Sequence, residues 1–554
     1  MLSGDAGTAR RLCLEILEEA PDHVGALRVL AGLSQADGAV DVAITLLRRI
    51  QRLMPDDLAV SQELAGLLLG AKRTAEAEAQ ARNAVRLAPE APTSHSLLAM
   101  ALTDGHQPHA GEFHYRQALA LAGPDAVTLS NLAWNLKLQG RVDEARTVYR
   151  EATAFDPSIL LTWLGWALTE EAGRNLEEAA RLVARVRRLD PAHDIGTIEA
   201  TLLARRGEWE AALVALRGAA QRPGGPGSDG LLETARVLDR LGRHDEAFAA
   251  MMEAKALTRQ AGYHYAAQAA AELTTRLAGF FTASRLRLLP RPETEAAGPQ
   301  PVFIVGAPRS GTTLVEQILS AHPAVAAGDE LPALDQVAAM VPQMLASPLA
   351  YPEALSELWM GDQRDGLTRL RDEYLRRARR LVTIGPGNRL FTDKMPFNEL
   401  HLGLTALMFP TAPVVHVLRH PLDVVLSMMA HNLTHGFNCA GDLETAARHC
   451  RRMLELVAHY RQNMLLRYLP LRYEDLVQDF EPNVRRLLGF AGLRFDRRCL
   501  RFDENRRYAR TASYAQVTER LYSRSLYRYR AYMRHLEPVV PILEPVIDSL
   551  GYSV

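Results

Sequence analysis

The 554-residue sequence has little of several features that would assign it to a class at once. Its four cysteines have no metal-like spacing and are too few for a disulfide scaffold, which fits a reducing compartment. No run of about 18 apolar residues occurs, so we expect no membrane span. The N-terminal segment has no hydrophobic signal core. These absences predict a soluble, cytoplasmic protein.

The sequence also lacks an excess of charge of either sign. The formal net charge is −1, which gives no support to nucleic acid or a membrane surface as a partner. The hydrophobic fraction of 48% is ample for sizeable cores, and the length predicts two to four domains.

What the first half of the sequence does contain is a repeat. Ala84, Ala118 and Ala152 are 34 residues apart, and small residues at fixed places let helices pack closely. Prolines recur every 33 to 35 residues, each just after an apolar helical pattern, at Pro21, Pro55, Pro89, Pro124, Pro157 and Pro191. This period, with helix–turn–helix content, is typical of tetratricopeptide repeats. We predict about seven repeats, from near residue 5 to near 258, in an all-α tetratricopeptide-repeat solenoid over residues 1–285.

Stacked repeats of this kind form a superhelix with a concave groove. The favoured role is a groove that binds a peptide or a partner protein. A spacer, or a dimerisation surface that would give a homodimer, remains an alternative. Residues 286–300 are rich in proline, glycine and charge, and we interpret them as a linker.

From residue 301 the pattern changes to strands alternating with helices, which predicts an α/β domain with a parallel sheet over residues 301–554. Buried strands are expected at 302–305, 414–418 and, more weakly, 469–473. Ligands of open parallel sheets bind at the carboxyl ends of the strands.

Three residues follow such strand ends: Arg309, Arg419 and Tyr473. We therefore expect them to share one site. The first strand runs into Gly306–Gly311 and then a helix from Thr312, which together make a cradle for a phosphate group. A turn with incidental glycines is the alternative.

The spacing of this loop matches the nucleotide-binding P-loop, but Thr312 stands where that loop has lysine. The only cation in the loop is Arg309. The loop is therefore expected to hold an anion, although not a triphosphate with magnesium in the usual way.

Further motifs follow in a fixed order. They are AHPAVAAGDE (321–330), TDKMPFN (392–398), VLRHPLDVVLSM (417–428), LRYEDL (471–476) and TASYAQV (511–517). Together with the loop they make the C-terminal half resemble sulfotransferases that use 3′-phosphoadenosine 5′-phosphosulfate. Within that family the resemblance is nearest to tyrosylprotein sulfotransferases and to bacterial proteins with tetratricopeptide repeats before this domain.

The resemblance implies a set of cofactor-binding residues. Arg309 would clasp the 5′-phosphosulfate bidentately, with further hydrogen-bond donors on neighbouring residues. Arg419 and Ser427 would hold the 3′-phosphate, and Tyr473 would touch the adenine. The alternative for Arg419 is an ion pair with Asp423 on the surface. The full set is Arg309, Ser310, Gly311, Thr312, Thr313, Arg419, Ser427, Tyr473, Ser513 and Arg528.

The resemblance also implies catalytic residues, which are Glu330, Arg309 and Lys394. Glu330 lies 21 residues after Arg309, the gap at which tyrosylprotein sulfotransferases carry their general base. An N-cap or a surface charge is the alternative, and Asp329 beside it could be mistaken for the base. Lys394, expected at a strand end, would stabilise the leaving bisphosphate.

A metal is not expected. His431 and His435 are four residues apart on a predicted helix, but no third ligand stands at good spacing. We interpret them as part of a solvated helix face.

The favoured function is transfer of a sulfuryl group to an acceptor hydroxyl, with protein tyrosine as the first candidate. A carbohydrate, lipid or small-metabolite acceptor is the alternative within the class. A P-loop kinase is disfavoured by Thr312 and by the lack of a clear magnesium aspartate. A non-enzymatic repeat scaffold with a degenerate nucleotide-binding domain is the remaining alternative.

Overall fold

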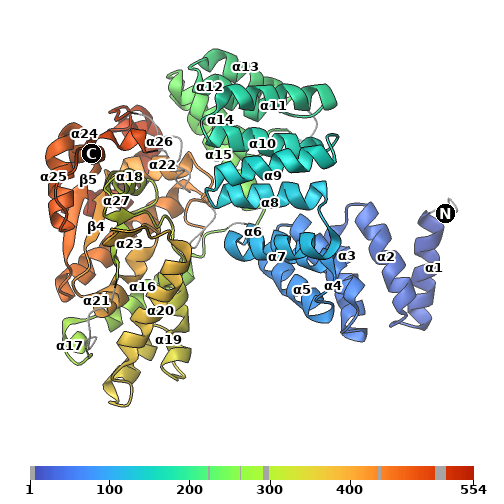
Figure 1. Cartoon of the computed structure of the whole chain (residues 1–554), viewed down its shortest axis with the longest axis horizontal. Coiled ribbons are helices and arrows are strands. Elements are labelled where there is room, and N and C mark those ends of the chain that lie inside the picture. The colour runs from blue at the N-terminus through green and yellow to red at the C-terminus, as the bar shows by residue number, and fades with distance from the viewer. Residues whose placement is uncertain are drawn as a thin grey trace. The chain divides into compact units, whose positions relative to one another are not determined.

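The computed structural model describes residues 6–105, 107–221, 225–262, 264–290, 298–433, 438–505 and 520–554. The chain divides into two compact units, Met1–His193 and Asp194–Val554 (Figure 1).

The first unit consists of helices, each of which packs against the next along the chain. They are α1 (Ala6–Glu19), α2 (Val24–Ala36), α3 (Val40–Leu53), α4 (Leu58–Gly70), α5 (Thr74–Leu87), α6 (Pro92–Asp104), α7 (Pro108–Ala122), α8 (Ala126–Leu138), α9 (Val142–Phe155), α10 (Leu160–Ala172) and α11 (Leu176–Leu189).

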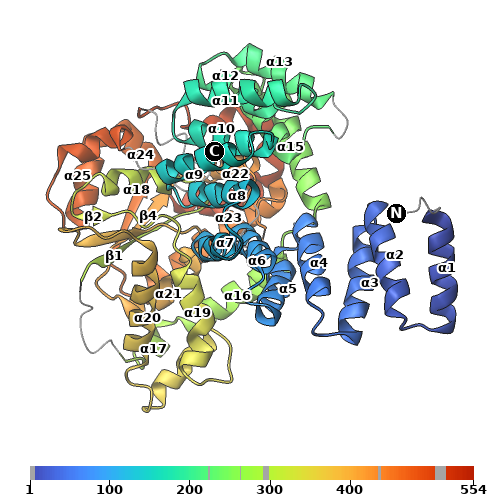
Figure 2. The same cartoon turned by 45° about the vertical axis from the view of Figure 1, so that its right-hand side comes forward.

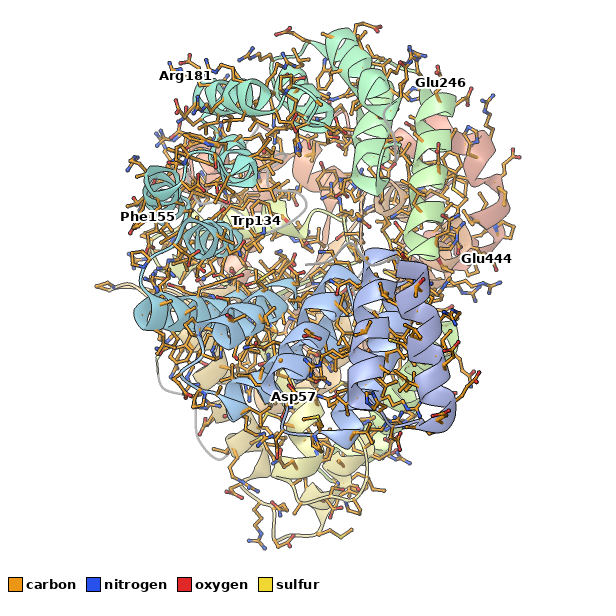
Figure 3. The ribbon with its side chains drawn as sticks, turned by 90° about the vertical axis from the view of Figure 1, so that its right-hand side faces the viewer. Asp57, Trp134, Phe155, Arg181, Glu246 and Glu444 are labelled. Carbon is orange, nitrogen blue, oxygen red and sulfur yellow. The ribbon has the colours of Figure 1, made fainter. Side chains whose placement is uncertain are left out.

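The repeat prolines explain where these helices end. Each stands two residues beyond the last residue of α1, α3, α5, α7, α9 or α11, because proline cannot continue a helix. Ala84, Ala118 and Ala152 are buried between helices, as the repeat predicted. Some starts have a side-chain cap: Asp57, labelled in Figure 3, precedes α4, and its carboxylate accepts the Val60 N–H at 3.1 Å. The predicted tetratricopeptide-repeat architecture is confirmed.

The second unit begins with further repeat helices and continues into the sheet. Its helices are α12 (Gly196–Arg205), α13 (Trp209–Ala220), α14 (Ser228–Arg240), α15 (His244–Gln260), α16 (Ala267–Phe280), α17 (Ala283–Leu286), α18 (Thr312–Ser320), α19 (Ala333–Met344), α20 (Gly366–Leu381), α21 (Leu402–Met408), α22 (Pro421–Met429), α23 (Leu443–Asn463), α24 (Tyr473–Gln478), α25 (Phe480–Phe490), α26 (Met533–Leu536) and α27 (Val540–Ser549). Short 3₁₀ segments are η1 (Glu353–Trp359), η2 (Asn398–His401), η3 (Arg497–Glu504), η5 (Arg528–Tyr532) and η6 (Glu537–Val539).

The strands form one parallel sheet in the order β2-β3-β1-β4-β5. They are β1 (Gln300–Val305), β2 (Val325–Ala326), β3 (Leu390–Asp393), β4 (Val414–Leu418) and β5 (Tyr468–Arg472). The predicted parallel sheet is confirmed, and the strand expected at 414–418 has those bounds. The third predicted strand is shifted by one residue, so that Tyr473 begins α24 instead of ending β5.

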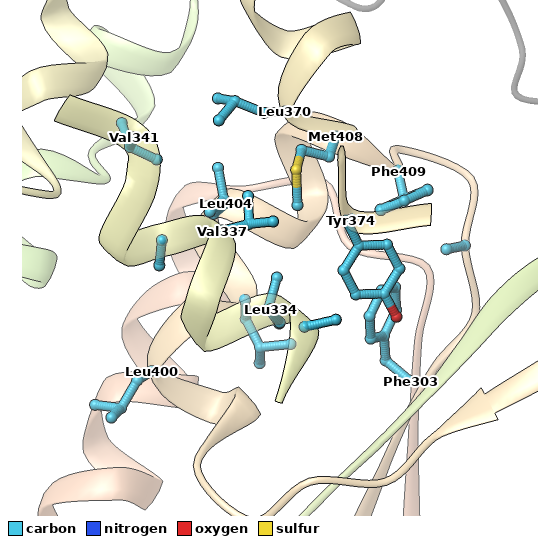
Figure 4. Packing of buried hydrophobic residues seen from close by; sticks show 14 of the residues in the cluster. Phe303, Leu334, Val337, Val341, Leu370, Tyr374, Leu400, Leu404, Met408 and Phe409 are labelled. Carbon is cyan, nitrogen blue, oxygen red and sulfur yellow. The ribbon is translucent and has the colours of Figure 1, made fainter. Parts of the chain in front are cut away.

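Helices cover both faces of the sheet, and successive strand residues point to opposite faces. Val302 and Ile304 pack with residues of α18, α24 and α25. Phe303 packs on the other face against Tyr374, with ring centroids 5.8 Å apart, in a core with Phe409 (Figure 4). Figure 2 shows the sheet between α18, α24 and α25 on one side and α19, α20 and α21 on the other.

The repeat helices α12 to α15 belong to the same compact unit as the sheet. Residues 291–297 of the expected linker lie outside the described residues. The division of the chain at residues 285 and 300 stays a prediction.

Candidate active site at the carboxyl edge of the sheet

The loop between β1 and α18 is tight and depends on two glycines. At Gly306, with φ of 150°, an added Cβ would lie 2.6 Å from the Val417 carbonyl oxygen. At Gly311, with φ of 109°, an added Cβ would lie 2.6 Å from Cδ2 of Tyr473. Arg309 has φ of 74°, a left-handed conformation that non-glycine residues seldom adopt. The loop therefore leads in one fixed path to the N-terminus of α18, where an anion is favoured.

Two arginines and a serine meet beside this loop. Arg309 Nε donates to Ser427 Oγ at 3.4 Å, and Arg419 Nη1 donates to the Arg309 carbonyl at 3.1 Å. Arg419 also donates to the Ser525 carbonyl. Burial and the neighbouring Arg419 guanidinium lower the pKa of Arg309 to about 10, because two cations share one partly buried space. Bound negative charge would relieve that repulsion.

A pocket with an empty volume of about 690 Å³ opens beside the loop, and we name it the loop pocket. It is lined by Arg309, Gly311, Thr313, Leu314, Arg419, Ser427, His431, Tyr473, Phe502, Arg520, Leu521, Tyr522, Ser525 and Arg528. It thus brings together most of the residues that the sequence predicted to bind one cofactor.

The remaining predicted cofactor residues lie next to the loop pocket or outside the described chain. Ser310 belongs to the loop, and Thr312 is the first residue of α18; both are buried. Ser513 lies outside the described residues.

Two buried polar atoms of the site have no hydrogen-bond partner in the described part of the chain: Ser310 Oγ and Arg419 Nε. An unsatisfied buried polar group costs about 1–3 kcal/mol. The Arg419 guanidinium also lies over the Tyr473 ring, 4.9 Å from its centroid. Phosphate or sulfate oxygens would accept from both atoms, so the donor set fits a ligand with anionic groups.

Glu330 and Lys394 form an ion pair at the same edge of the sheet. Lys394 Nζ lies 2.7 Å from Glu330 Oε1. The Lys394 side chain is 2% exposed and that of Glu330 is 33% exposed. Lys394 directly follows β3 and so lies at a strand end, as expected, and β3 is the neighbour of β1. Neither residue lines the loop pocket.

The turn before Glu330 is closely packed. At Gly328 an added Cβ would lie 1.9 Å from the Thr392 carbonyl oxygen, so only glycine fits. Asp329 has φ of 59°; its N–H donates to Glu316 Oε1 at 2.9 Å, and its carbonyl accepts the Lys394 N–H at 3.0 Å. Asp329 is buried in this network. Glu330 has the more exposed carboxylate of the two.

Asp393, the residue before Lys394, accepts a hydrogen bond on each of its carboxylate oxygens. Its carboxylate accepts the Tyr374 hydroxyl at 2.6 Å and the Asn398 amide at 2.8 Å. Burial raises the pKa of Asp393 to about 7. These contacts hold the end of β3, and with it the backbone of Lys394.

Arg528 connects the loop pocket to a repeat helix. Its Nε donates to Asp239 Oδ1 at 2.9 Å, and the Tyr532 hydroxyl donates to the same oxygen at 2.6 Å. Asp239 lies on α14. The sequence predicted Arg528 at the cofactor but gave no sign of this partner.

Arg528 also lines a second, larger hollow of about 2000 Å³, which we name the arginine groove. The groove lies between α12, α14 and the segment 522–531. It shares four residues with the loop pocket: His431, Tyr522, Ser525 and Arg528.

Several residues of the loop pocket were not predicted from the sequence, above all His431. His431 is not part of a solvated helix face but lines both hollows, whereas His435 lies outside the described residues. Its position one helical turn after Ser427 was the available signal. Tyr522 and Ser525 had none, because they reach the pocket through an irregular segment.

In the described ranges no group of three or more histidine, cysteine or carboxylate side chains is placed to hold a metal ion. None of the helices described is both long and apolar enough to cross a membrane.

Comparison with known proteins finds relatives that match parts of this chain. An uncharacterized protein of Aquifex aeolicus is 33% identical over 258 residues, which is 45% of this chain and 33% of that protein. The protein-tyrosine sulfotransferase 1 of Danio rerio is 29% identical over 210 residues, 37% of this chain and 56% of that protein. The chain thus spans between a third and just over half of the length of these relatives.

Among solved structures, a tetratricopeptide repeat protein from Parabacteroides merdae covers 42% of this chain and 93% of its own, at 14% identity and a TM-score of 0.37. Residues 301–497 match the model of the sulfotransferase family. The part of the chain over residues 301–497 is therefore a sulfotransferase-family domain.

Proposed function

We propose that the protein transfers the sulfuryl group of 3′-phosphoadenosine 5′-phosphosulfate to an acceptor hydroxyl. The observation that carries this proposal is the meeting of Arg309, Arg419 and Ser427 around the loop pocket, beside the N-terminus of α18. Ser310 Oγ and Arg419 Nε, which have no hydrogen-bond partner among the described residues, support an anionic nucleotide there, in agreement with the family of residues 301–497.

In this proposal the nucleotide's two anionic ends are held by different groups. Arg309 and the donors of Ser310 to Thr313 bind the 5′-phosphosulfate, and Arg419 with Ser427 binds the 3′-phosphate. The Tyr473 ring offers an aromatic surface for the adenine base. When bound, the nucleotide supplies a sulfuryl group on a phosphate leaving group.

Glu330 and Lys394 are the residues proposed to catalyse the transfer step. The acceptor oxygen bonds to sulfur as its proton passes to the Glu330 carboxylate, and the bond from sulfur to the bridging oxygen breaks. The Lys394 ammonium stabilises the negative charge that develops on that oxygen, an effect of about 2.7–4 kcal/mol for a comparable preorganised hydrogen-bond donor. Lys394 donates to Oε1 of Glu330, so Oε2 is the oxygen proposed to take the proton.

Protein tyrosine is the acceptor that we propose first. The relative from Danio rerio is named a protein-tyrosine sulfotransferase, and Glu330 stands at the gap that the resemblance assigns to the base of that branch. The repeats would then bind the acceptor protein or a separate partner through their concave surface. All four cysteines are free and buried, which supports a reducing compartment such as the cytoplasm.

The test is transfer of radiolabelled sulfur from the nucleotide to candidate acceptors. Tyrosine-containing polypeptides, carbohydrates, lipids and small phenols or alcohols form the panel. Label on tyrosine is the expected result. Label on another class of acceptor would support sulfotransferase activity but contradict tyrosine as the acceptor. A protein that binds the nucleotide but labels no acceptor would favour the non-enzymatic scaffold.

A further inference from the structure

His431 is a histidine of the loop pocket to which the proposed function gives no role. It follows α22 and lines the pocket together with Arg309, Ser427 and Arg528. Its backbone is held from a repeat helix, because the buried Lys255 ammonium of α15 donates to its carbonyl. The backbone of His431 is therefore held in place beside the pocket.

The hydrogen bonds of the ring define its tautomer. His431 Nδ1 lies 2.7 Å from the Ser427 carbonyl oxygen, which can only accept, so Nδ1 carries a hydrogen. Burial, and after it the charge of Arg309 with those of Arg528 and Lys255, lower the pKa of the ring well below its ordinary value. A neutral ring with hydrogen on Nδ1 has a lone pair on Nε2, which is then a hydrogen-bond acceptor.

An acceptor is unusual at this position, since the charged side chains around it are hydrogen-bond donors. Arg309, Arg419 and Arg528 can donate but not accept. A ligand that accepts hydrogen bonds from these arginines and also bonds to Nε2 must bring both acceptors and a donor.

The nucleotide of the proposed function offers few such donors. Adenosine 3′,5′-bisphosphate, the part shared by the sulfuryl donor and its product, has phosphate groups that accept at neutral pH. Its hydrogen-bond donors are the ribose 2′-hydroxyl and the adenine 6-amino group. The 2′-hydroxyl is adjacent to the 3′-phosphate, and His431 is one helical turn from Ser427, which is proposed to bind that phosphate.

We propose that His431 Nε2 accepts a hydrogen bond from the ribose 2′-hydroxyl, so that the protein distinguishes ribonucleotides from 2′-deoxyribonucleotides. This inference rests on the proposed function, because it takes the nucleotide from there. It makes His431 a specificity-determining residue of the loop pocket.

The experiment is calorimetric binding of adenosine 3′,5′-bisphosphate and of its 2′-deoxy analogue to the full-length protein. The wild type is expected to bind the deoxy analogue about tenfold more weakly, the scale of one neutral hydrogen bond with its acceptor left unpaired. His431→Phe, which has no acceptor, is expected to bind both alike. His244→Phe is the matched control, since His244 lines the arginine groove but not the loop pocket, and it should keep the wild-type ratio.

Several results would overturn the inference. If the wild type binds both nucleotides equally, the inference on His431 is wrong while the proposed function stands. If the wild type binds neither nucleotide, the inference and the proposed function are both wrong. A tenfold preference that persists in His431→Phe would assign the 2′-hydroxyl to another group. If His431→Phe does not fold, His431→Asn takes its place, because its shorter side chain falls short of the ligand. His431→Asn is expected to lose the preference for the ribonucleotide. If it keeps that preference, the inference is contradicted.

A third ligand, inosine 3′,5′-bisphosphate, lacks the adenine amino group. It tests whether Nε2 contacts the base instead of the ribose. The wild type and His431→Phe should lose the same factor with it. A loss confined to the wild type would place Nε2 at the base and contradict the assignment to the ribose.

Discussion

Lys394 Nζ lies 2.7 Å from Glu330 Oε1, and this ion pair joins the end of β3 to the turn before α19. The two side chains differ in exposure, with the ammonium buried and the carboxylate a third exposed. This difference in exposure fits the proposed roles, since the leaving group must lie within the protein and the acceptor must enter from solvent.

Glu330→Gln should lower the rate of sulfuryl transfer by about 10²- to 10⁴-fold, because the amide cannot take the acceptor proton. Its affinity for adenosine 3′,5′-bisphosphate should change by less than about twofold, since Glu330 does not line the loop pocket. Single-turnover rates and calorimetry measure the two quantities. Glu353→Gln is the control, because Glu353 pairs with Arg276 away from the site. Wild-type rates in Glu330→Gln would require another base.

Asp239→Asn should weaken binding of the bisphosphate by about fivefold, because Arg528 loses its charged partner on α14. The matched variant is Asp245→Asn. Asp245 also joins a repeat helix to the C-terminal segment, through Arg534 and His535, but these do not line the loop pocket.

Equal thermal stability of the two variants with a binding defect only in Asp239→Asn is the expected pattern. Equal affinity in both variants would mean that the Asp239–Arg528 contact is structural only. The comparison thus tests whether the repeat helix α14 contributes to the nucleotide site.

Gly328→Ala should destabilise the protein by about 3 kcal/mol, the upper end for overpacking, because the new methyl group would overlap the Thr392 carbonyl. The strain falls next to Glu330, so transfer should slow as well. Gly489→Ala on α25 is the control, where an added Cβ meets nothing within 4 Å and a small gain in stability is expected. Denaturant unfolding measures both, and a neutral Gly328→Ala would contradict the packing described.

The stability of the second unit should fall as the pH rises from about 4 to 7, through the titration of Asp393. Burial raises its pKa from 3.8 to about 7, so the folded state binds the proton that the unfolded state has released. The contribution is full below pH about 4, declines by up to about 1.4 kcal/mol per pH unit, and is lost above about 7. Asp393→Asn should flatten this decline in unfolding free energies measured between pH 4 and 8. An unchanged slope in the variant would assign the decline to another group.

The sequence predicted those parts of the site that depend on local pattern. The loop with Arg309 and the helix from Thr312 follow from glycine spacing and strand–helix alternation, and Lys394 was correctly expected at a strand end. Parallel topology then brings the carboxyl ends of β1, β3 and β4 together, which is why Arg419 could be predicted beside the loop.

The rest depends on contacts between distant segments. Arg528 and Asp239 are 289 residues apart, and no local pattern couples an arginine to a repeat helix. His431 was interpreted as solvated because its spacing to His435 describes a helix surface, whereas α22 ends at Met429 and the ring enters the pocket. Tyr473 was expected at the end of a strand, and it begins a helix with its ring against Gly311 and Arg419.

The most direct test of the account is calorimetric binding of adenosine 3′,5′-bisphosphate to the wild type and to Arg419→Ala, with ATP and magnesium as the comparison ligand. We expect the wild type to bind the bisphosphate more tightly than ATP. Arg419→Ala should lose about 2–5 kcal/mol of that affinity, the scale for one partner of a buried charge pair. A wild type that does not bind the bisphosphate, or that prefers ATP with magnesium, would contradict the assignment of the loop pocket.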